Sequence, residues 1–327
     1  MRILYIDYGD VVSDTHTYQY YGDLFRELKL LAQVYLLQGV PRNINDILSQ
    51  IDGGVDCIIF GLGYFAQSHP DFFNIIEGLS TVDIPVVCMI HKPQTMLNKK
   101  LDFCEFNKVD LIVDSQCTYK EFQATTGIKS IRIPFTATPK LFYPRSVEKK
   151  YDIGFSGALH GKNPNGEQKI FGPTANLRER VYEKLTERNR NIFWNSSNTM
   201  EYRINSVEDY ATKINECRMW LGTTGPVLDV SPRYFEVMLS KTLLLCNNMP
   251  EQYEEYFTDG INCVIFNNDL SDFDEKLDYY LNNEGEMNRV IETAYDAAIN
   301  NYTWHHMAKK LIQTIKELKN EVDTMHE

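Results

Sequence analysis

The sequence lacks long hydrophobic runs and an excess of positive charge, and each absence excludes a class of protein. Its apolar runs end within ten residues, well short of the roughly 20 that a transmembrane helix needs. Lysine and arginine number 33 against 45 aspartates and glutamates, which gives a net charge of −12. Because an acidic surface repels phosphate groups, we expect neither broad nucleic-acid binding nor binding to an anionic membrane.

Cysteine is present, but not in pairs that would suit a metal or a disulfide framework. The seven cysteines show no CxxC spacing, and most lie inside apolar, strand-like runs. This pattern is typical of reduced, buried thiols in a cytosolic protein. The chain opens on the strand-like MRILYIDYGD, so we expect no signal peptide and a cytoplasmic location.

The adjacent His305 and His306 do not indicate a metal site. Neighbouring side chains on a helix point about 100° apart, so these two cannot chelate one ion together. No HxxxH spacing or His/Asp cluster supplies further ligands. We therefore expect no metal cofactor.

What the sequence does have is an alternation of short apolar runs and helix-period segments. RILYIDY, VDCIIF and IPVVCMIH are strand-like, and DFFNIIEGLS at 71–80 is one of the segments between strands that we expect to be helical. The alternation predicts βαβ units and parallel sheets. It is interrupted at 136–150 by two prolines and a cluster of charges, as is typical of a linker between domains.

After this linker the rhythm restarts with YDIGFSG, RMWLGTT and TLLLC. The sequence therefore predicts an α/β protein with two Rossmann-like, doubly wound domains in tandem. Open sheets of this kind bind ligands at the carboxyl ends of their strands. We expect the two domains to face a cleft in which two substrates meet.

Two glycine-rich segments match phosphate-binding motifs only in part. GLGYFA at 61–66 fits GxGxxA but does not open a helix, which favours a tight turn over a dinucleotide site. GALHGK at 157–162 is one residue short of a Walker motif and lacks its magnesium-binding hydroxyl. Gly157 still ends a strand, where a backbone can approach an anion, and Lys162 and Arg178 could supply positive charge. An ordinary glycine turn with solvated cations is the alternative.

The segment SPRYFEVMLSK, from residue 231, places two charges at the start of a helix that should be buried. Ser231 suits the N-cap and Pro232 the first helical position. Arg233 opposes the helix dipole, a cost that a diphosphate bound at the helix end would remove. Glu236 shares a face with Arg233 and suits the two hydroxyls of a ribose. The alternative is an Arg–Glu surface pair.

Polar residues also follow strands of the first domain. His91 ends IPVVCMIH, at the carboxyl edge of the predicted sheet and hence in the expected cleft. A histidine that caps the next turn is the alternative. Asp10 and His16 lie in the loop after the first strand and share this location.

Taken in order, these segments resemble the glycosyltransferase group 1 family, most closely its CgeB-like branch, which has the GT-B fold of two Rossmann-like domains. The similar segments run from YDIGFSG through DYATKINECRMWLGTTG and SPRYFEVMLSKTLLL to NNYTWHHMAKKL, and cover roughly residues 150–312. The first half resembles the acceptor domain of the family more loosely, through IPVVCMIH, VDLIVDS and IPFTATPKLFYP.

The resemblance implies metal-independent transfer of a sugar from a nucleoside-diphosphate sugar (a UDP-, GDP- or dTDP-sugar) to an acceptor hydroxyl. Glu236 would hold the ribose and Arg233 the diphosphate, while His91 matches a histidine that contacts the sugar near the reacting carbon in retaining relatives. The expected substrate-binding residues are Gly157, Lys162, Arg178, Thr223, Thr224, Arg233, Tyr234 and Glu236. The expected catalytic residues are His91, His16 and Asp10.

The last helix of such enzymes returns to the first domain, so we expect domains of 1–145 with 305–327, and of 146–304. Leu228 stands where many relatives have the first of two glutamates, so the residues that bind the donor sugar are not identified. The acceptor, a glycan, a protein or a small molecule, is open too. A sugar-nucleotide epimerase or hydrolase and a non-catalytic sugar-nucleotide-binding protein remain alternatives.

Overall fold

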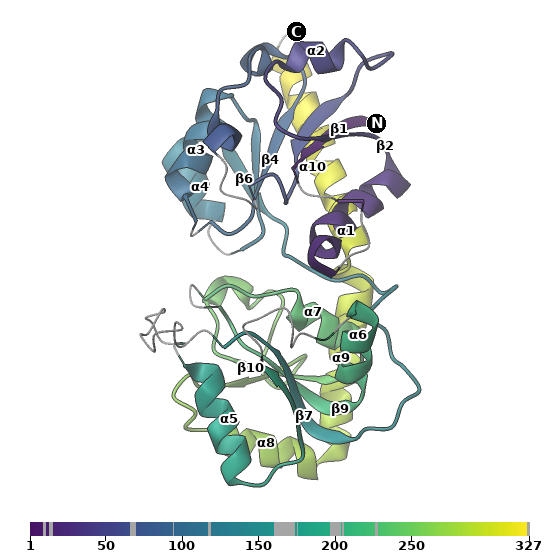
Figure 1. Cartoon of the computed structure of the whole chain (residues 1–327), viewed down its shortest axis with the longest axis vertical. Coiled ribbons are helices and arrows are strands. Elements are labelled where there is room, and N and C mark those ends of the chain that lie inside the picture. The colour runs from purple at the N-terminus through teal and green to yellow at the C-terminus, as the bar shows by residue number, and fades with distance from the viewer. Residues whose placement is uncertain are drawn as a thin grey trace. The chain divides into compact units, whose positions relative to one another are not determined.

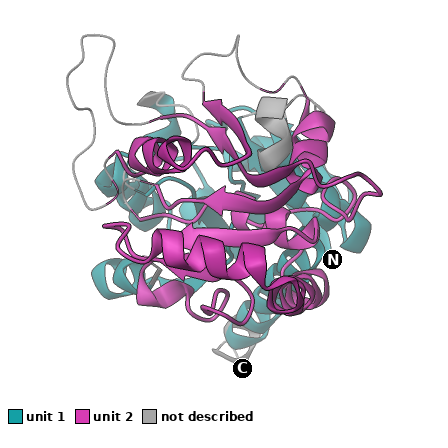
Figure 2. Cartoon of the chain, turned by 90° about the horizontal axis from the view of Figure 1, so that it is seen from below, with its two compact units in different colours: residues 1–135, 304–327 teal, residues 136–303 magenta. Residues whose placement is uncertain are grey.

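The computed structural model describes residues 1–8, 11–12, 16–65, 70–93, 95–116, 119–159, 174, 176–196, 204, 206–225 and 228–325. The chain divides into two compact units (Figure 2). Unit 1 comprises Met1–Phe135 and Trp304–Glu327, and unit 2 comprises Thr136–Thr303. Among the described residues, no helix combines the length and the apolar character needed to cross a membrane.

Unit 1 contains a six-stranded parallel sheet in the order β2-β1-β3-β4-β5-β6. Its strands are short apolar runs, buried on both faces in the middle of the sheet, as parallel strands covered by helices must be. The strands are β1 (Arg2–Asp7), β2 (Gln33–Gln38), β3 (Cys57–Phe60), β4 (Val86–Ile90), β5 (Leu111–Asp114) and β6 (Lys129–Arg132).

Helices cover both faces of this sheet. Figure 1 shows α3 and α4 on one side and α1 and α10 on the other. Right-handed crossovers explain the arrangement, because the chain winds from β1 to β2 in one direction and from β3 to β6 in the other. The helices are α1 (His16–Leu31), α2 (Ile44–Leu48), α3 (Leu97–Phe106), α4 (Tyr119–Thr126) and α10 (Trp304–Met325).

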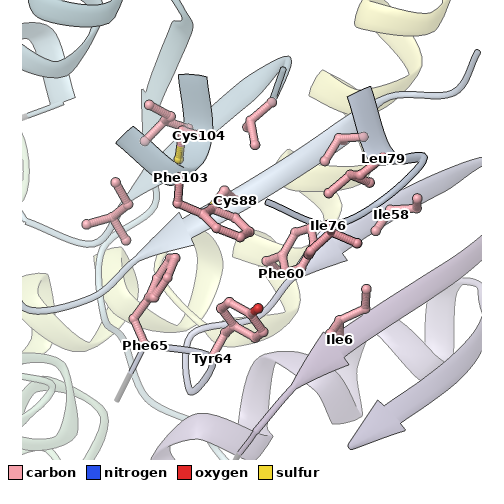
Figure 3. Close-up of a cluster of buried hydrophobic side chains, with 14 of the residues drawn as sticks. Ile6, Ile58, Phe60, Tyr64, Phe65, Ile76, Leu79, Cys88, Phe103 and Cys104 are labelled. Carbon is pink, nitrogen blue, oxygen red and sulfur yellow. The ribbon is translucent and has the colours of Figure 1, made fainter. Parts of the chain in front are cut away.

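An aromatic cluster holds the turn after β3 against α3 (Figure 3). The ring of Phe60 lies 4.9 Å from that of Tyr64 and 5.3 Å from that of Phe103, both edge to face. Phe65 also packs edge to face on Phe103, at 5.4 Å. Large rings in this geometry add packing energy beyond their buried area, so the backbone that follows β3 is firmly anchored.

The helix expected around 71–80 is absent. The chain instead forms two short 3₁₀ turns, η1 (Pro70–Phe73) and η2 (Leu79–Thr81). Gly78 between them has a φ of 79°, which an α-helix does not allow. The side chain of Asn107 accepts a hydrogen bond from the backbone N–H of Ile76 at 2.8 Å. A tertiary contact thus takes the donor that a helix would have used.

Unit 2 contains a five-stranded parallel sheet in the order β11-β10-β9-β7-β8. Its strands are β7 (Tyr151–Gly157), β8 (Ile192–Ser196), β9 (Cys217–Gly222), β10 (Leu243–Asn247) and β11 (Val264–Phe266). Its helices are α5 (Leu177–Glu187), α6 (Val207–Asn215), α7 (Arg233–Leu239), α8 (Phe273–Asn282) and α9 (Glu284–Asn301), with a 3₁₀ turn η4 (Glu251–Tyr253). The predicted pair of doubly wound α/β domains is confirmed.

The connectivity of unit 2 creates a switch point beside β7. The chain passes from β7 through α5 to β8, then returns through α6 to β9 on the other side of β7. Figure 1 shows α5 and α6 on opposite sides of the sheet as a result. Loops that diverge in this way leave room for a ligand at the carboxyl end of the strand between them. That end is Gly157.

Candidate functional site

Two arginines converge on the carboxyl end of β7. The guanidinium carbons of Arg178, on α5, and Arg233, on α7, lie 5.4 and 5.6 Å from the centre of the Phe155 ring. A Cβ on Gly157 would lie 3.1 Å from Nη2 of Arg233 and 3.6 Å from Nη1 of Arg178. Gly157 therefore lets two cationic side chains approach the backbone at the switch point.

The environment of Arg178 favours an anionic ligand. Its Nε donates to Oγ1 of Thr223 at 2.7 Å, and its Nη1 donates to the carbonyl of Ala158. Burial, and then the charge of Arg233, lower the pKa of Arg178 to about 10. The charges of Glu179 and Asp229 oppose this lowering. Two guanidinium groups held this close together favour an anion between them.

A buried carboxylate lies on the same helix as Arg233. Glu236 is 1% exposed, and its Oε2 accepts a hydrogen bond from the Tyr210 hydroxyl at 3.0 Å. The same hydroxyl accepts a hydrogen bond from Nε of Arg233 at 3.3 Å. One tyrosine on α6 therefore contacts both charged groups. Sequence reasoning missed this residue, because Tyr210 fits the apolar face of its helix.

The start of α7 differs from the prediction. The helix begins at Arg233 with Pro232 as its N-cap, and the buried hydroxyl of Ser231 makes no hydrogen bond to any residue that the structure describes. The N–H of Tyr234 donates to the carbonyl of Ser231, and that of Glu236 to the carbonyl of Pro232. The backbone closes this turn by itself, so those two N–H groups are not open to a ligand. The arginines, rather than these two N–H groups, are therefore the candidates for binding an anion at the site.

The other expected residues of unit 2 have different surroundings. Thr223 is buried beside Arg178 and accepts its hydrogen bond. Thr224 is held by Asn247 at the end of β10, through N–H···Oδ1 at 2.8 Å and Nδ2–H···Oγ1 at 3.0 Å. Tyr234 is fully buried, 5.1 Å from the Phe257 ring, and its hydroxyl has no hydrogen-bond partner among the described residues. Tyr234 thus has the position of a core residue.

A tight turn follows β9 where the resemblance would place a first glutamate. The N–H of Gly225 donates to the carbonyl of Asp229 at 2.8 Å, and the N–H of Leu228 donates to Gly225 at 2.9 Å. Leu228 has a φ of 62°, an unusual value for a branched apolar residue. The carboxylate of Asp229 acts on Arg178 through its charge, so this turn borders the arginine site.

In unit 1, His91 follows β4 and lies among aromatic rings. Its ring is 5.5 Å from that of Tyr21 and 5.2 Å from that of Phe135. The side chain is half-buried, but Nδ1 is enclosed and, within the described part of the chain, has no hydrogen-bond partner. Burial, with smaller contributions from Lys92 and Lys100, lowers the pKa of His91 to about 3. The imidazole is therefore neutral at physiological pH.

A buried lysine fixes the backbone around His91. Lys100 is 2% exposed, and its Nζ donates to the carbonyls of His91 at 2.8 Å and Lys92 at 3.0 Å. Burial lowers the pKa of this ammonium to about 8. Lys92 has a φ of 50°, so the chain turns sharply after the strand. Sequence reasoning missed Lys100, whose role depends on a contact across a turn.

The carboxyl end of β1 carries a second residue that the sequence did not single out. Asp7 is fully buried, and its Oδ2 accepts a hydrogen bond from the N–H of Gly63 at 3.0 Å. A Cβ on Gly61 or Gly63 would lie 2.3 or 2.4 Å from this carboxylate. The glycines of GLGYFA are thus required by Asp7. The segment forms a turn rather than the start of a helix.

Three predicted residues cannot be placed in the site. Asp10 and Lys162 lie outside the described residues, and although α1 begins at His16, the side chain of His16 is not described. Among the described residues, no cluster of three potential metal ligands occurs. His305 instead contacts Oε2 of Glu27 through Nδ1, at 3.0 Å.

Two kinds of comparison with known proteins bear on the class of the protein. Residues 158–313 match the model of a family described as glycosyl transferase-like. The fold is the GT-B fold of glycosyltransferases, and the family match together with this fold supports a glycosyltransferase. No curated protein matched the sequence.

Solved structures similar to the chain span its whole length. A glycosyltransferase from Rickettsia africae has 12% identity and a TM-score of 0.61, with 97% of this chain and 98% of that chain covered. Sucrose-phosphate synthase from Thermosynechococcus elongatus has 10% identity and a TM-score of 0.60, with 97% and 99% covered. Anabaena HepE in complex with UDP-glucose has 12% identity and a TM-score of 0.56, with 97% and 100% covered. At these identities the likeness establishes the fold.

Proposed function

We propose that the protein transfers a sugar from a nucleoside-diphosphate sugar to an acceptor hydroxyl, as a member of the CgeB-like branch. The observation that carries this proposal is the convergence of Arg178 and Arg233 on Gly157, beside the buried carboxylate of Glu236. The donor nucleotide would bind at the switch point of unit 2.

The two arginines would bind the diphosphate. Guanidinium groups match phosphate oxygens in geometry and stay charged when partly buried. As the bond to the sugar breaks, negative charge grows on the leaving diphosphate, and two fixed cations would stabilise it. In this proposal they take the place of a metal ion. Lys162 is a further candidate for the same task.

Glu236 would bind the ribose. A carboxylate accepts hydrogen bonds from two vicinal hydroxyls, and this one is held rigidly by Tyr210. Thr223 would support the diphosphate indirectly, since its hydroxyl orients Arg178. Thr224 would shape the wall of the site through Asn247.

His91 would act on the sugar and the acceptor from unit 1. A neutral imidazole can donate or accept a hydrogen bond without placing a positive charge near the cationic transition state of sugar transfer. Asp10 and His16 remain catalytic candidates of the same unit. The acceptor would be a glycan, a protein or a small molecule that carries a hydroxyl.

UDP-sugars are the first donors to test, because HepE was crystallised with UDP and with UDP-glucose. A thermal-shift screen would compare UDP-, GDP-, dTDP- and CDP-sugars. A donor present at 100 times its dissociation constant should stabilise the protein by about 2.7 kcal/mol. The donor that gives this shift would then be assayed for hydrolysis and transfer.

Glu236→Ala tests the placement of the site. We expect the stabilisation by every nucleoside diphosphate to disappear. The matched control is Glu292→Ala in the same unit, whose carboxylate forms an exposed ion pair with Lys241. Unchanged affinity in Glu236→Ala would show that the nucleotide binds elsewhere. Binding without turnover would favour a non-catalytic sugar-nucleotide-binding protein, as Leu228 in place of a glutamate would allow.

A further inference from the structure

Tyr210 lies between the two charged residues of α7. Its hydroxyl donates to Oε2 of Glu236 at 3.0 Å and accepts from Nε of Arg233 at 3.3 Å. A phenol has one proton to donate and lone pairs to accept with, so this hydroxyl serves a carboxylate and a guanidinium together. Burial, and then the charge of Glu236, raise the pKa of Tyr210, which keeps the proton on the phenol.

The ring of Tyr210 is anchored independently of its hydroxyl. It packs edge to face against Trp220 on β9 at 5.7 Å and against Phe142 at 6.0 Å. A phenylalanine would satisfy both of these contacts. The hydroxyl is therefore not needed for packing, yet it lies fully inside the protein, where an unsatisfied polar atom is costly. Its contacts with the two charged residues account for its presence.

We propose that Tyr210 is a positioning residue that couples the ribose and diphosphate halves of the nucleotide site. It fixes the rotation of the Glu236 carboxylate and holds the Arg233 guanidinium over Phe155, so that both groups meet the ligand in one arrangement. This role rests on the proposed function. Hydrogen bonds within a buried network reinforce one another, so binding at one half should depend on the other.

Tyr210→Phe is the direct test, with the dissociation constant of UDP measured by calorimetry. We expect it to rise about tenfold, in line with the loss of hydrogen bonds to charged groups. Tyr302→Phe is the matched control, since that hydroxyl donates a single hydrogen bond to the carbonyl of Glu255 at 3.2 Å in the same unit. It should leave UDP affinity unchanged.

A double-mutant cycle with Glu236→Gln separates positioning from a general structural effect. If Tyr210 acts through Glu236, the double variant should bind UDP almost as well as Glu236→Gln alone. Unchanged UDP affinity in Tyr210→Phe, or losses that add fully in the double variant, would overturn the role. If the wild type binds none of UDP, GDP, dTDP and CDP, the proposed function fails, and this role fails with it.

Should Tyr210→Phe fold poorly, 3-fluorotyrosine at position 210 gives a second test. It keeps the ring and both hydrogen bonds but makes the phenol a stronger donor and a weaker acceptor. The dissociation constant of UDP should then shift while the melting temperature stays near that of the wild type. An unchanged dissociation constant would argue against the role.

Discussion

The carboxyl edges of the two sheets share a topology but differ in charge. In unit 2, Arg178, Arg233 and Glu236 are ionic groups gathered around the end of β7. In unit 1, His91 is held neutral among aromatic rings. Asp7 in that unit is turned into the protein and bonded to the turn after β3. The same doubly wound arrangement thus presents two arginines and a buried carboxylate in one unit and a neutral imidazole among aromatic rings in the other, because side chains rather than topology set the chemistry.

The largest effect should come from substituting His91, which we expect to lower turnover without changing nucleotide binding. His91→Ala should lower kcat by roughly a hundredfold or more, the range of a group that assists proton transfer or contacts the reacting centre. The dissociation constant of the donor nucleotide should not change, because that nucleotide is assigned to unit 2. Steady-state kinetics with calorimetry would test both parts. His305→Gln is the control in unit 1 and should change neither kcat nor the dissociation constant. If His91→Ala lowers nucleotide affinity as much as it lowers kcat, the assignment of nucleotide binding to unit 2 alone is wrong.

The next effect should come from the arginine pair. Arg178→Met should weaken UDP binding by roughly ten- to a hundredfold, since it removes one charged partner of the diphosphate. Binding of uridine alone should be unaffected. Arg188→Met is the control at the end of the same helix. It removes an exposed arginine that pairs with Asp274 and Asp278, and it should leave UDP affinity unchanged. Similar losses in both variants would mean that overall charge, rather than this site, attracts the ligand.

The strands were predictable because their signal is local. Each is a short apolar run bounded by turn residues, and the final helix was equally clear. The charged residues of α7 also stood out, because Arg233 opposes the helix dipole and Glu236 is an acid within an apolar segment. The expected helix near 71–80 failed for a tertiary reason, since Asn107 takes the N–H of Ile76.

The supporting residues could not be predicted, because their roles depend on distant contacts. Tyr210 satisfies the apolar pattern of α6, and only the fold brings its hydroxyl to Glu236, 26 positions away. Asp7 is 56 positions from Gly63, whose N–H it binds. The sequence around Lys100 suggests a charged side chain on a solvent-exposed helix face. Lys100 is instead buried, and its ammonium donates to two backbone carbonyls. Sequence patterns therefore singled out charged residues that differ from their apolar surroundings, but not the residues whose contacts hold them in place.

A smaller effect should follow from filling the space at Gly157. In Gly157→Ala the new Cβ would lie 3.1 Å from Nη2 of Arg233 and 3.2 Å from the Phe155 ring, so the guanidinium must shift by a few tenths of an ångström. We expect roughly a threefold to tenfold rise in the dissociation constant of UDP, from one poorly aligned charged hydrogen bond. Gly285→Ala, where a Cβ meets nothing within 4 Å, is the control. Equal affinities would show that the diphosphate does not use Arg233 in this position.

The smallest effect concerns pH and belongs to unit 1. The pKa of His91 falls from 6.5 to about 3 on folding, so between these values the unfolded chain binds a proton that the folded protein rejects. The contribution of His91 to the free energy of unfolding is therefore complete above about pH 6.5 and is lost progressively as the pH falls toward 3. In His91→Gln the melting temperature should drop less than in the wild type on going from neutral pH to about pH 5. His305→Gln should not lessen this drop. If His91→Gln is as acid-sensitive as the wild type, the imidazole is not held neutral, and the two units differ less in charge than their structures indicate.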